Sequence, residues 1–189
     1  GLTFNRVELQ EFLQKLGEFQ GYLNFEQVGM FVSAMADKLM QSYSVLELDL
    51  NNQAPVLVPN DFKVEEVRDD VIDPITRRSN AFEYYRTQLL LSFLASYHST
   101  GKLILRGNVG GFLAFEASGG DVTLNGSAGQ FGCASLNGAI VRINGFADHE
   151  LLFGADAGQV HIRDGFCCIS PGYFAGAPAG TNYTTVSRA

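Results

Sequence analysis

The chain has 189 residues, of which 46% are hydrophobic and 17% are charged, and its formal net charge is −7. This amount of apolar material is enough for one domain, or for two small domains that share a core. The acidic balance argues against nucleic acid as a partner, because phosphate binding relies on clustered Lys and Arg, and the lack of any run near ~18 apolar residues argues against a membrane span.

The cysteine content bears on the compartment of the protein. The chain has three cysteines, Cys133, Cys167 and Cys168, and the last two are neighbours, between which a disulfide would be strained. We therefore expect reduced thiols and a cytoplasmic protein. Because the chain begins with Gly1 instead of Met, the sequence leaves open whether a targeting segment precedes it.

The first forty residues show the apolar spacing of amphipathic helices. One short helix is expected to end around Gly17 to Gly21, with a stripe made by Val7, Phe12, Leu13, Leu16 and Phe19. A second is expected to begin at Asn24, which can cap it together with Gln27. The stripe of this second helix is Val28, Phe31, Val32, Met35 and Leu39.

Residues 45–50 alternate with period two and predict a short strand. Pro55 and Pro59 then interrupt the chain, and an acidic run over residues 65–73 is typical of a solvated surface. From Pro74, a favourable first-turn residue, the apolar spacing predicts a long helix to about Tyr97, with His98 in its last turn.

The chain changes character near residue 100, where a repeat begins. Of the 21 glycines, 17 lie at or after Gly101. Four segments align at a fixed offset of 19 residues: GKLILRGNVGGF, GDVTLNGSAGQF, AIVRINGFADHE and GQVHIRDGFCCI. The alignment stacks aliphatic residues in two columns, Leu103, Val122, Val141, Val160 and Leu105, Leu124, Ile143, Ile162. A glycine follows each strand, and the last, Gly165, is displaced by one position, which we interpret as an insertion of Asp164.

A 19-residue unit with one strand cannot bury its own apolar face, so the units must stack. The sequence therefore predicts an α+β protein, in which an N-terminal helical cap precedes a short right-handed parallel β-helix of about four 19-residue coils. We place a mainly helical cap region over residues 1–100, the β-helix over 101–170 and a C-terminal tail over 171–189. An antiparallel sheet of Gly-rich strands is the alternative.

The segments GNVGGFLAFEASGG and GSAGQFGCASLNGA carry a family resemblance. They resemble the glycine repeats of the β-helical domain found at the C-terminus of the glutamate synthase large subunit and in the β-helical subunit of formylmethanofuran dehydrogenase. The resemblance covers about residues 101–169 and implies a right-handed coil with a structural, interface-forming role, while other domains or subunits do the chemistry. This chain departs from the pattern at residues 146–150, where FADHE replaces the Gly-rich turn.

Two groups of residues are candidates for a functional site. Asp148, His149 and Glu150 replace a neutral turn with ionisable groups, which could hold a metal or act in acid–base chemistry, although an exposed polar loop explains them as well. Arg142, His161 and Arg163 are expected on one outward face of the coils, where they could bind a carboxylate or an acidic partner.

The cysteines are weaker candidates. Cys167 and Cys168 lack the spacing of a metal motif, and Cys133 falls in a column with Ala114 and Leu152 that is typical of a core. The sequence also lacks a nucleophile elbow, a phosphate loop and a dinucleotide fingerprint. We therefore expect no cofactor.

The function favoured by the sequence is that of a non-catalytic structural or assembly protein, which forms a homo-oligomer or serves as one component of a protein complex. One alternative is an enzyme or a metal-dependent binding module that uses the loop 148–150. Another, which rests on the resemblance alone, is an accessory subunit of a glutamate synthase-like or formylmethanofuran dehydrogenase-like complex.

Overall fold

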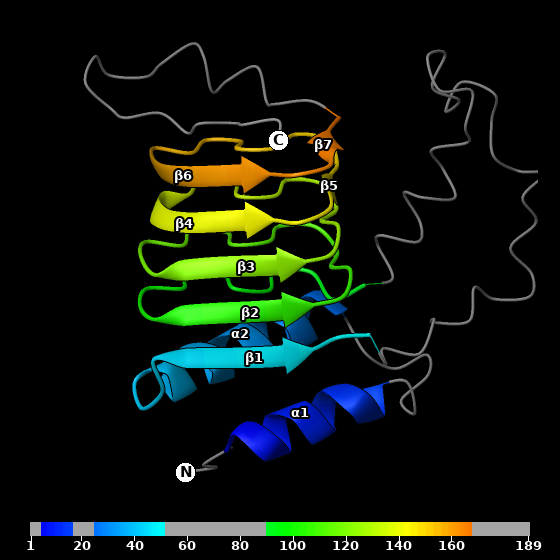
Figure 1. Cartoon of the computed structure of the whole chain (residues 1–189), viewed down its shortest axis with the longest axis vertical. Helices are drawn as coiled ribbons and strands as arrows, with labels where there is room; N and C mark the ends of the chain where they lie inside the picture. Colours follow the sequence, from blue (N-terminus) through cyan, green and yellow to red (C-terminus); the bar gives the residue numbers. More distant parts are fainter. Residues whose placement is uncertain (1–4, 17–24, 52–89, 168–189) are drawn as a thin grey trace, which may run out of the picture.

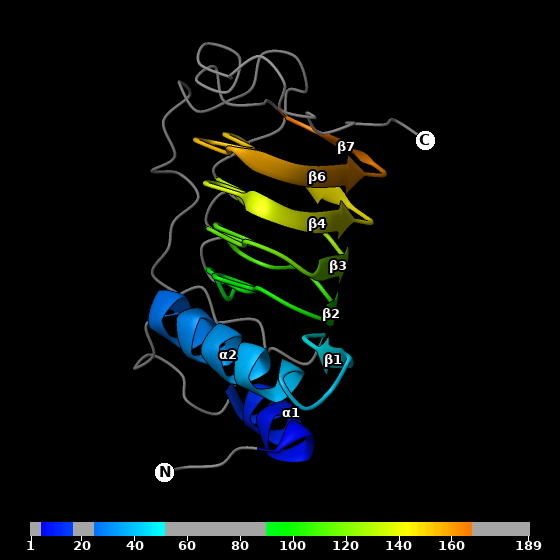
Figure 2. The ribbon, with the colours of Figure 1, turned by 90° about the vertical axis from the view of Figure 1, so that its left-hand side faces the viewer.

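The computed structural model describes residues 5–16, 25–51 and 90–167. Two helices lie at one end of a parallel β-helix that rises above them (Figure 1). The strands run in one direction on the front of the coil and the chain returns behind them as it climbs, so the coil is right-handed (Figures 1 and 2). The elements are α1 (Arg6–Lys15), α2 (Phe25–Met40), β1 (Val45–Asp49), β2 (Lys102–Arg106), β3 (Asp121–Asn125), β4 (Asn137–Ile143), β5 (Phe146–Ala147), β6 (Ala157–Ile162) and β7 (Gly165–Phe166).

The predicted stacking of aliphatic residues is confirmed. The strands form a five-stranded parallel sheet in the order β1-β2-β3-β4-β6. Leu105 lies opposite Leu124, Leu124 opposite Ile143, and Ile143 opposite Ile162. These side chains are at most 3% exposed, so the two columns form one continuous interior. The parallel pairing excludes the antiparallel alternative for this sheet.

The sheet begins earlier in the chain than the repeat does. The predicted strand near residue 45 is confirmed as β1, and it pairs in parallel with β2, so that Leu46 faces Leu103 and Leu48 faces Leu105. The β-helix therefore takes its first strand from within the region that the sequence assigned to the helical cap. The aliphatic columns continue through β1, because Leu46 and Leu48 are fully buried.

The prediction of a helix from Pro74 to Tyr97 is wrong where the structure describes it. Residues 94–97 form a turn and residues 90–93 are irregular. Residues 74–89 and the acidic run at 65–73 lie outside the described residues. The backbone of this segment pairs with the next coil: the N–H of Phe93 donates to the carbonyl of Gly111, and that of Tyr97 donates to Phe115. His98 is consequently not at a helix end. It is a buried residue of the first coil.

In residues 93–97, and in the equivalent segments of the following described coils, the backbone conformation alternates from one residue to the next. Non-glycine residues recur there at intervals of two with φ between 52° and 63°, in the left-handed region that L-residues seldom occupy. They stack in columns 19 residues apart: Phe93, Phe112, Phe131, Glu150; Ala95, Ala114, Cys133, Leu152; and Tyr97, Glu116, Ser135. The middle column is at most 2% exposed and completes the core.

The helices cover the first-coil end of the β-helix (Figure 2). In α1, Asn5 caps the first turn and forms a capping box with Glu8, while Leu9 and Leu13 are buried. In α2, Val28 and Val32 are buried, and the hydroxyl of Ser33 donates to the carbonyl of Phe93 at 2.7 Å. The two predicted amphipathic helices are thereby confirmed, although two residues of the predicted stripes are exposed, Val7 at 64% and Phe31 at 39%. The predicted positions Phe19 and Asn24 lie outside the described residues, as does the tail 171–189.

The register corrects the interpretation of Asp164 as an insertion. Phe146 pairs with Gly165 and Ala147 pairs with Phe166, so the offset stays at 19 residues into the last coil. Asp164 therefore takes the place of Gly145 in its column, and Gly165 adopts φ of +116° next to it.

Neither described helix is long and apolar enough to cross a bilayer.

Candidate functional site

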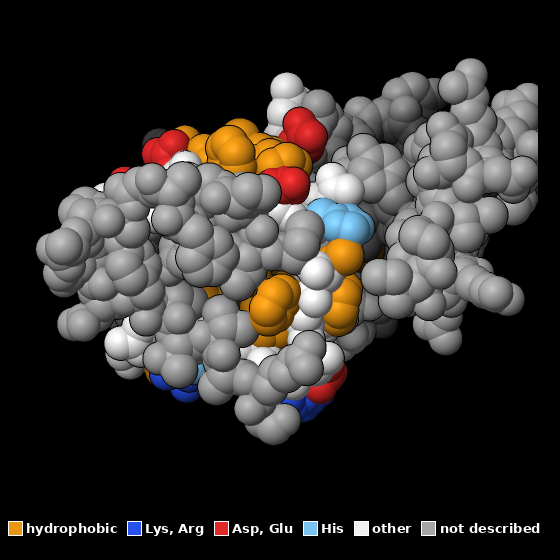
Figure 3. Space-filling model, turned by 90° about the horizontal axis from the view of Figure 1, so that it is seen from above, with side chains coloured by type: hydrophobic (Ala, Val, Ile, Leu, Met, Phe, Trp, Pro, Cys, Tyr) orange, Lys and Arg blue, Asp and Glu red, His pale blue; other side chains and the backbone are white. Residues whose placement is uncertain are grey.

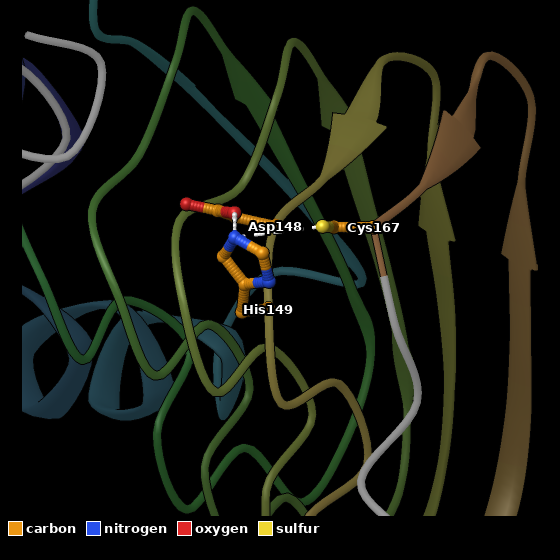
Figure 4. A group of neighbouring side chains, drawn as sticks. All are labelled: Asp148, His149 and Cys167. Atoms are coloured by element: carbon orange, nitrogen blue, oxygen red, sulfur yellow. Dashed lines mark hydrogen bonds and ion pairs between the residues drawn. The ribbon is translucent and has the colours of Figure 1, made fainter. Parts of the chain in front are cut away.

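The loop 148–150 and the end of the last described coil converge on one cluster of side chains (Figure 4). The Nε2 atom of His149 lies 3.4 Å from Oδ1 of Asp148 and 3.4 Å from Sγ of Cys167. One potential ligand atom from each residue lies within 4.8 Å of the other two. The three residues, which we call the end cluster, comprise an imidazole, a carboxylate and a thiol.

The coil geometry accounts for this convergence. Ala147 and Phe166 are paired residues of β5 and β7, so the residues that follow them, Asp148 and Cys167, occupy one column. The N–H of Cys167 donates to the carbonyl of Ala147 at 3.0 Å, which fixes the two backbones together. The sequence-based prediction treated Asp148 and His149 apart from Cys167, yet the 19-residue offset between Asp148 and Cys167 contains the signal that joins them.

Glu150, the third residue of the predicted loop site, is not a member of the end cluster. It occupies the column of Phe112 and Phe131 and is partly buried there. The structure therefore brings together two of the three residues in the predicted site and replaces the third with Cys167.

The arrangement is unlike a nucleophile–base–carboxylate triad. In such a triad the base receives the nucleophile's proton on one ring nitrogen, and the carboxylate orients the ring through the other nitrogen. Here the carboxylate of Asp148 and the thiol of Cys167 both contact the same nitrogen of His149. Three potential ligand atoms within 4.8 Å of one another are instead close to the spacing expected of metal ligands.

The outer surface of the five-stranded sheet, which we call the strand face, contains the predicted outward row of Arg142, His161 and Arg163. On this face Arg142 is the direct neighbour of His161 in the β4–β6 pair. The guanidinium of Arg142 is 2.5 Å from the carboxylate of Asp121, and that of Arg163 donates to Asp164 at 2.8 and 3.0 Å. The two arginines are thus paired with acidic neighbours on their own surface. This reduces the positive character that the sequence predicted for this face.

The pairing of Arg163 also appears in the pKa values of both partners. Hydrogen bonding to Asp164 raises the pKa of Arg163, and hydrogen bonding to Arg163 lowers the pKa of Asp164. Both side chains are more than half exposed, so this interaction contributes little to the stability of the fold.

Cys133 is a core residue, as its column predicts. Its side chain is fully buried, and burial raises the pKa of its thiol to about 12. Because metals bind the thiolate, a thiol that stays protonated at neutral pH is a poor ligand. Of the two cysteines that the structure describes, only Cys167 is exposed, while Cys168 lies outside the described residues.

A row of aromatic rings on the side of the coil is a feature that the sequence-based predictions missed. The rings of Phe93 and Phe112 stack at 4.5 Å with 2° between their planes, and those of Phe112 and Phe131 stack at 5.0 Å with 9°. Phe115, Tyr97 and Phe153 pack edge-on around this stack. We call these six residues the aromatic face.

The signal for the aromatic face was partly visible in the sequence. Phe112 and Phe131 are 19 residues apart, and Phe93 is 19 residues before Phe112. The assignment of residues up to Tyr97 to a helix concealed this third member.

Seen along the coil in Figure 3, hydrophobic side chains gather at one edge of the molecule, and Lys and Arg lie at the opposite edge.

Comparison of the chain with protein-family models, with curated proteins and with solved structures found no match. The resemblance to the β-helical parts of glutamate synthase and formylmethanofuran dehydrogenase therefore stays a prediction.

Proposed function

We propose that this protein is a non-catalytic assembly protein that associates through its aromatic face. The observation that carries the proposal is the exposure of that face: Tyr97 is 57% exposed and Phe153 is 52% exposed, and both lie at the margin of a continuous stack of rings. Large aromatic side chains that form a contiguous exposed patch are typical of protein–protein contacts, where their burial supplies much of the binding energy.

The proposed occupant of the aromatic face is a second copy of this chain. The rings repeat with the coil, at centroid distances of 4.5 and 5.0 Å, and a surface with the same repeat is available on another copy. A two-fold axis would place the two rows against each other in a self-complementary contact, which is the commonest geometry of homodimers.

The strand face supports the same assignment by contrast. Arg106 forms an ion pair with Glu47, and Arg142 forms one with Asp121, so the charges on this face are balanced within the molecule. A solvated surface with paired charges gains little from association. The aromatic face is the side of the coil that gains free energy from losing contact with water.

Sedimentation equilibrium tests the proposal. We expect the wild-type chain to sediment as a dimer and the double variant Tyr97→Asn/Phe153→Ser to sediment as a monomer with an unchanged circular dichroism spectrum. Asparagine is chosen because Tyr97 has φ of 58°, a value that Asn tolerates.

The matched control is Phe146→Ser, which removes a 43% exposed phenylalanine from β5, outside the aromatic face. This control should remain dimeric. A wild-type chain that stays monomeric throughout the concentration series, or a double variant as dimeric as the control, would overturn the proposal.

A further inference from the structure

We infer that the end cluster, Asp148, His149 and Cys167, is a binding site for zinc or a zinc-like divalent transition metal. The inference is independent of the proposed assembly function, since it concerns the end of the coil and not the aromatic face. It rests on the proximity of three metal-binding atoms, which lie within 4.8 Å of one another, with Nε2 of His149 at 3.4 Å from both the Asp148 oxygen and the Cys167 sulfur.

The spacing of these atoms suits a tetrahedral zinc ion. Zinc binds sulfur at ~2.3 Å and nitrogen or oxygen at ~2.0–2.2 Å, so two tetrahedral ligand atoms lie about 3.3 to 3.6 Å apart. Both distances to the imidazole nitrogen already equal 3.4 Å. The ligand atoms of all three residues lie within 4.8 Å of one another, so a small rotation of the Asp148 or Cys167 side chain completes the triangle.

The donor types select the class of metal. A thiolate is a soft ligand that favours zinc and related transition ions, an imidazole suits the same ions, and a carboxylate completes sets of this kind. Magnesium and calcium prefer oxygen ligands alone and would gain little from Cys167 or His149. The end cluster therefore predicts selectivity for zinc over magnesium.

The fold holds the ligands in place before a metal arrives. Asp148 and Cys167 follow the paired residues Ala147 and Phe166, and the N–H of Cys167 bonds to the carbonyl of Ala147. His149 is fixed through its N-terminal neighbour and through its own carbonyl, which accepts from the N–H of Phe131 at 2.9 Å. Three such ligands leave a fourth position for water or an external donor, and the 40% exposure of His149 makes that position accessible.

Titration of the full chain with zinc chloride in a calorimeter tests the inference, and cobalt(II) provides a spectroscopic probe. We expect one zinc ion per chain and, with cobalt, a thiolate-to-metal charge-transfer absorption band. Loss of an outer-shell partner alone weakens metal binding about 10- to 100-fold, so removing a ligand in His149→Ala or Asp148→Asn should weaken zinc binding by at least about 100-fold.

Each ligand has a matched control nearby in the chain. Glu150→Gln is the control for Asp148→Asn, and His161→Ala is the control for His149→Ala. Both controls should bind zinc with wild-type affinity. Cys167→Ser should abolish the charge-transfer band, and Cys168→Ser should preserve it. Thermal unfolding without metal verifies that each variant is folded.

Three outcomes would overturn the inference: no stoichiometric zinc binding to the wild-type chain, equal affinity in the ligand variants and their controls, or a charge-transfer band that survives Cys167→Ser. The aromatic face contains none of these residues, so the ligand variants should sediment as the wild-type chain does. A loss of zinc binding can therefore be distinguished from a loss of assembly.

Discussion

His98 shows at the scale of a single residue how burial in the coil changes chemistry. Its side chain is 1% exposed, and its Nδ1 atom lies 3.9 Å from Oδ1 of Asp37. Burial lowers the pKa of His98, whereas contact with the backbone of Gly101 and the charges of Asp37 and Asp121 raise it, and the effect of burial is the largest. The folded protein therefore favours the neutral imidazole.

This shift predicts how stability depends on pH. The unfolded chain takes up a proton on His98 near its ordinary pKa of 6.5, and the folded chain does so only at lower pH. Between these values the unfolded state binds more protons, so the free energy of unfolding is at its full value above pH 6.5 and falls as the pH drops through the folded pKa. Urea unfolding at several pH values should show this fall, and His98→Gln should remove it.

His161 provides the control for the pH experiment. It lies on the strand face next to Arg142. The variant His161→Gln should keep the wild-type slope of unfolding free energy against pH, since His98 remains in place. An identical slope in His98→Gln and wild type over about one pH unit below 6.5 would contradict the assignment.

At the scale of elements, β1 is an edge strand, and the side chain of Gln10 forms hydrogen bonds with its outer edge at Asp49. The side-chain amide of Gln10 in α1 donates to the carbonyl of Asp49 at 2.8 Å, and its oxygen accepts from the N–H of Asp49 at 2.8 Å. The amide thereby reproduces the pairing that a further strand would give. Unpaired strand edges are sites of aggregation, and this contact protects one end of the sheet.

Removal of the Gln10 contact should destabilise the cap. Gln10→Ala loses two hydrogen bonds, each with a net contribution of about 1 kcal/mol, so we expect the free energy of unfolding to fall by about 2 kcal/mol. Hydrogen exchange at the Asp49 N–H should accelerate as well. Gln14 is an exposed residue of the same helix, and Gln14→Ala should change the free energy of unfolding by less than about 0.5 kcal/mol. Equal effects of the two variants would contradict a stabilising role of the Gln10–Asp49 hydrogen bonds.

The same elements show how much of the fold the sequence determines. The stacked strands β2 to β6 were predictable, because aliphatic columns at a fixed offset admit one register. Pairing of β1 with β2 was not, since 52 residues separate Asp49 from Lys102 and no repeat connects them. Residues 90–97 misled the prediction because Phe93, Leu94 and Tyr97 have helical spacing, whereas their alternating backbone leaves no glycine signal.

The candidate site was predictable in part for a similar reason. Asp148 and His149 stood out because they interrupt a glycine-rich turn. Cys167 did not, because its position was considered beside Cys168 instead of one coil above Asp148. The balance of charge around Arg142 and Arg163 depends on the neighbours Asp121 and Asp164, and only the three-dimensional register brings Asp121 to Arg142.

At the scale of the whole molecule, the height of the β-helix depends on how closely successive coils approach at their turns. Gly107, Gly126 and Gly145 stack in one column. A Cβ built on Gly126 would lie 2.1 Å from the carbonyl oxygen of Gly107, and one on Gly145 would lie 2.3 Å from that of Gly126. Both obstacles are backbone atoms, which cannot move unless the coils separate.

Gly126→Ala should therefore be among the most damaging single substitutions in the coil. A methyl group at this position forces two hydrogen-bonded backbones apart. Overpacking typically costs about 1–3 kcal/mol in free energy of unfolding, and because the obstacle is backbone we expect a loss of about 3 kcal/mol. Gly154→Ala is the matched comparison: its φ is +64°, and the atom nearest to an added Cβ is the Ser135 hydroxyl oxygen at 3.6 Å. It meets only the torsional cost of about 1 kcal/mol. Urea unfolding should rank the two variants in this order, and equal losses would contradict a steric requirement for glycine at position 126.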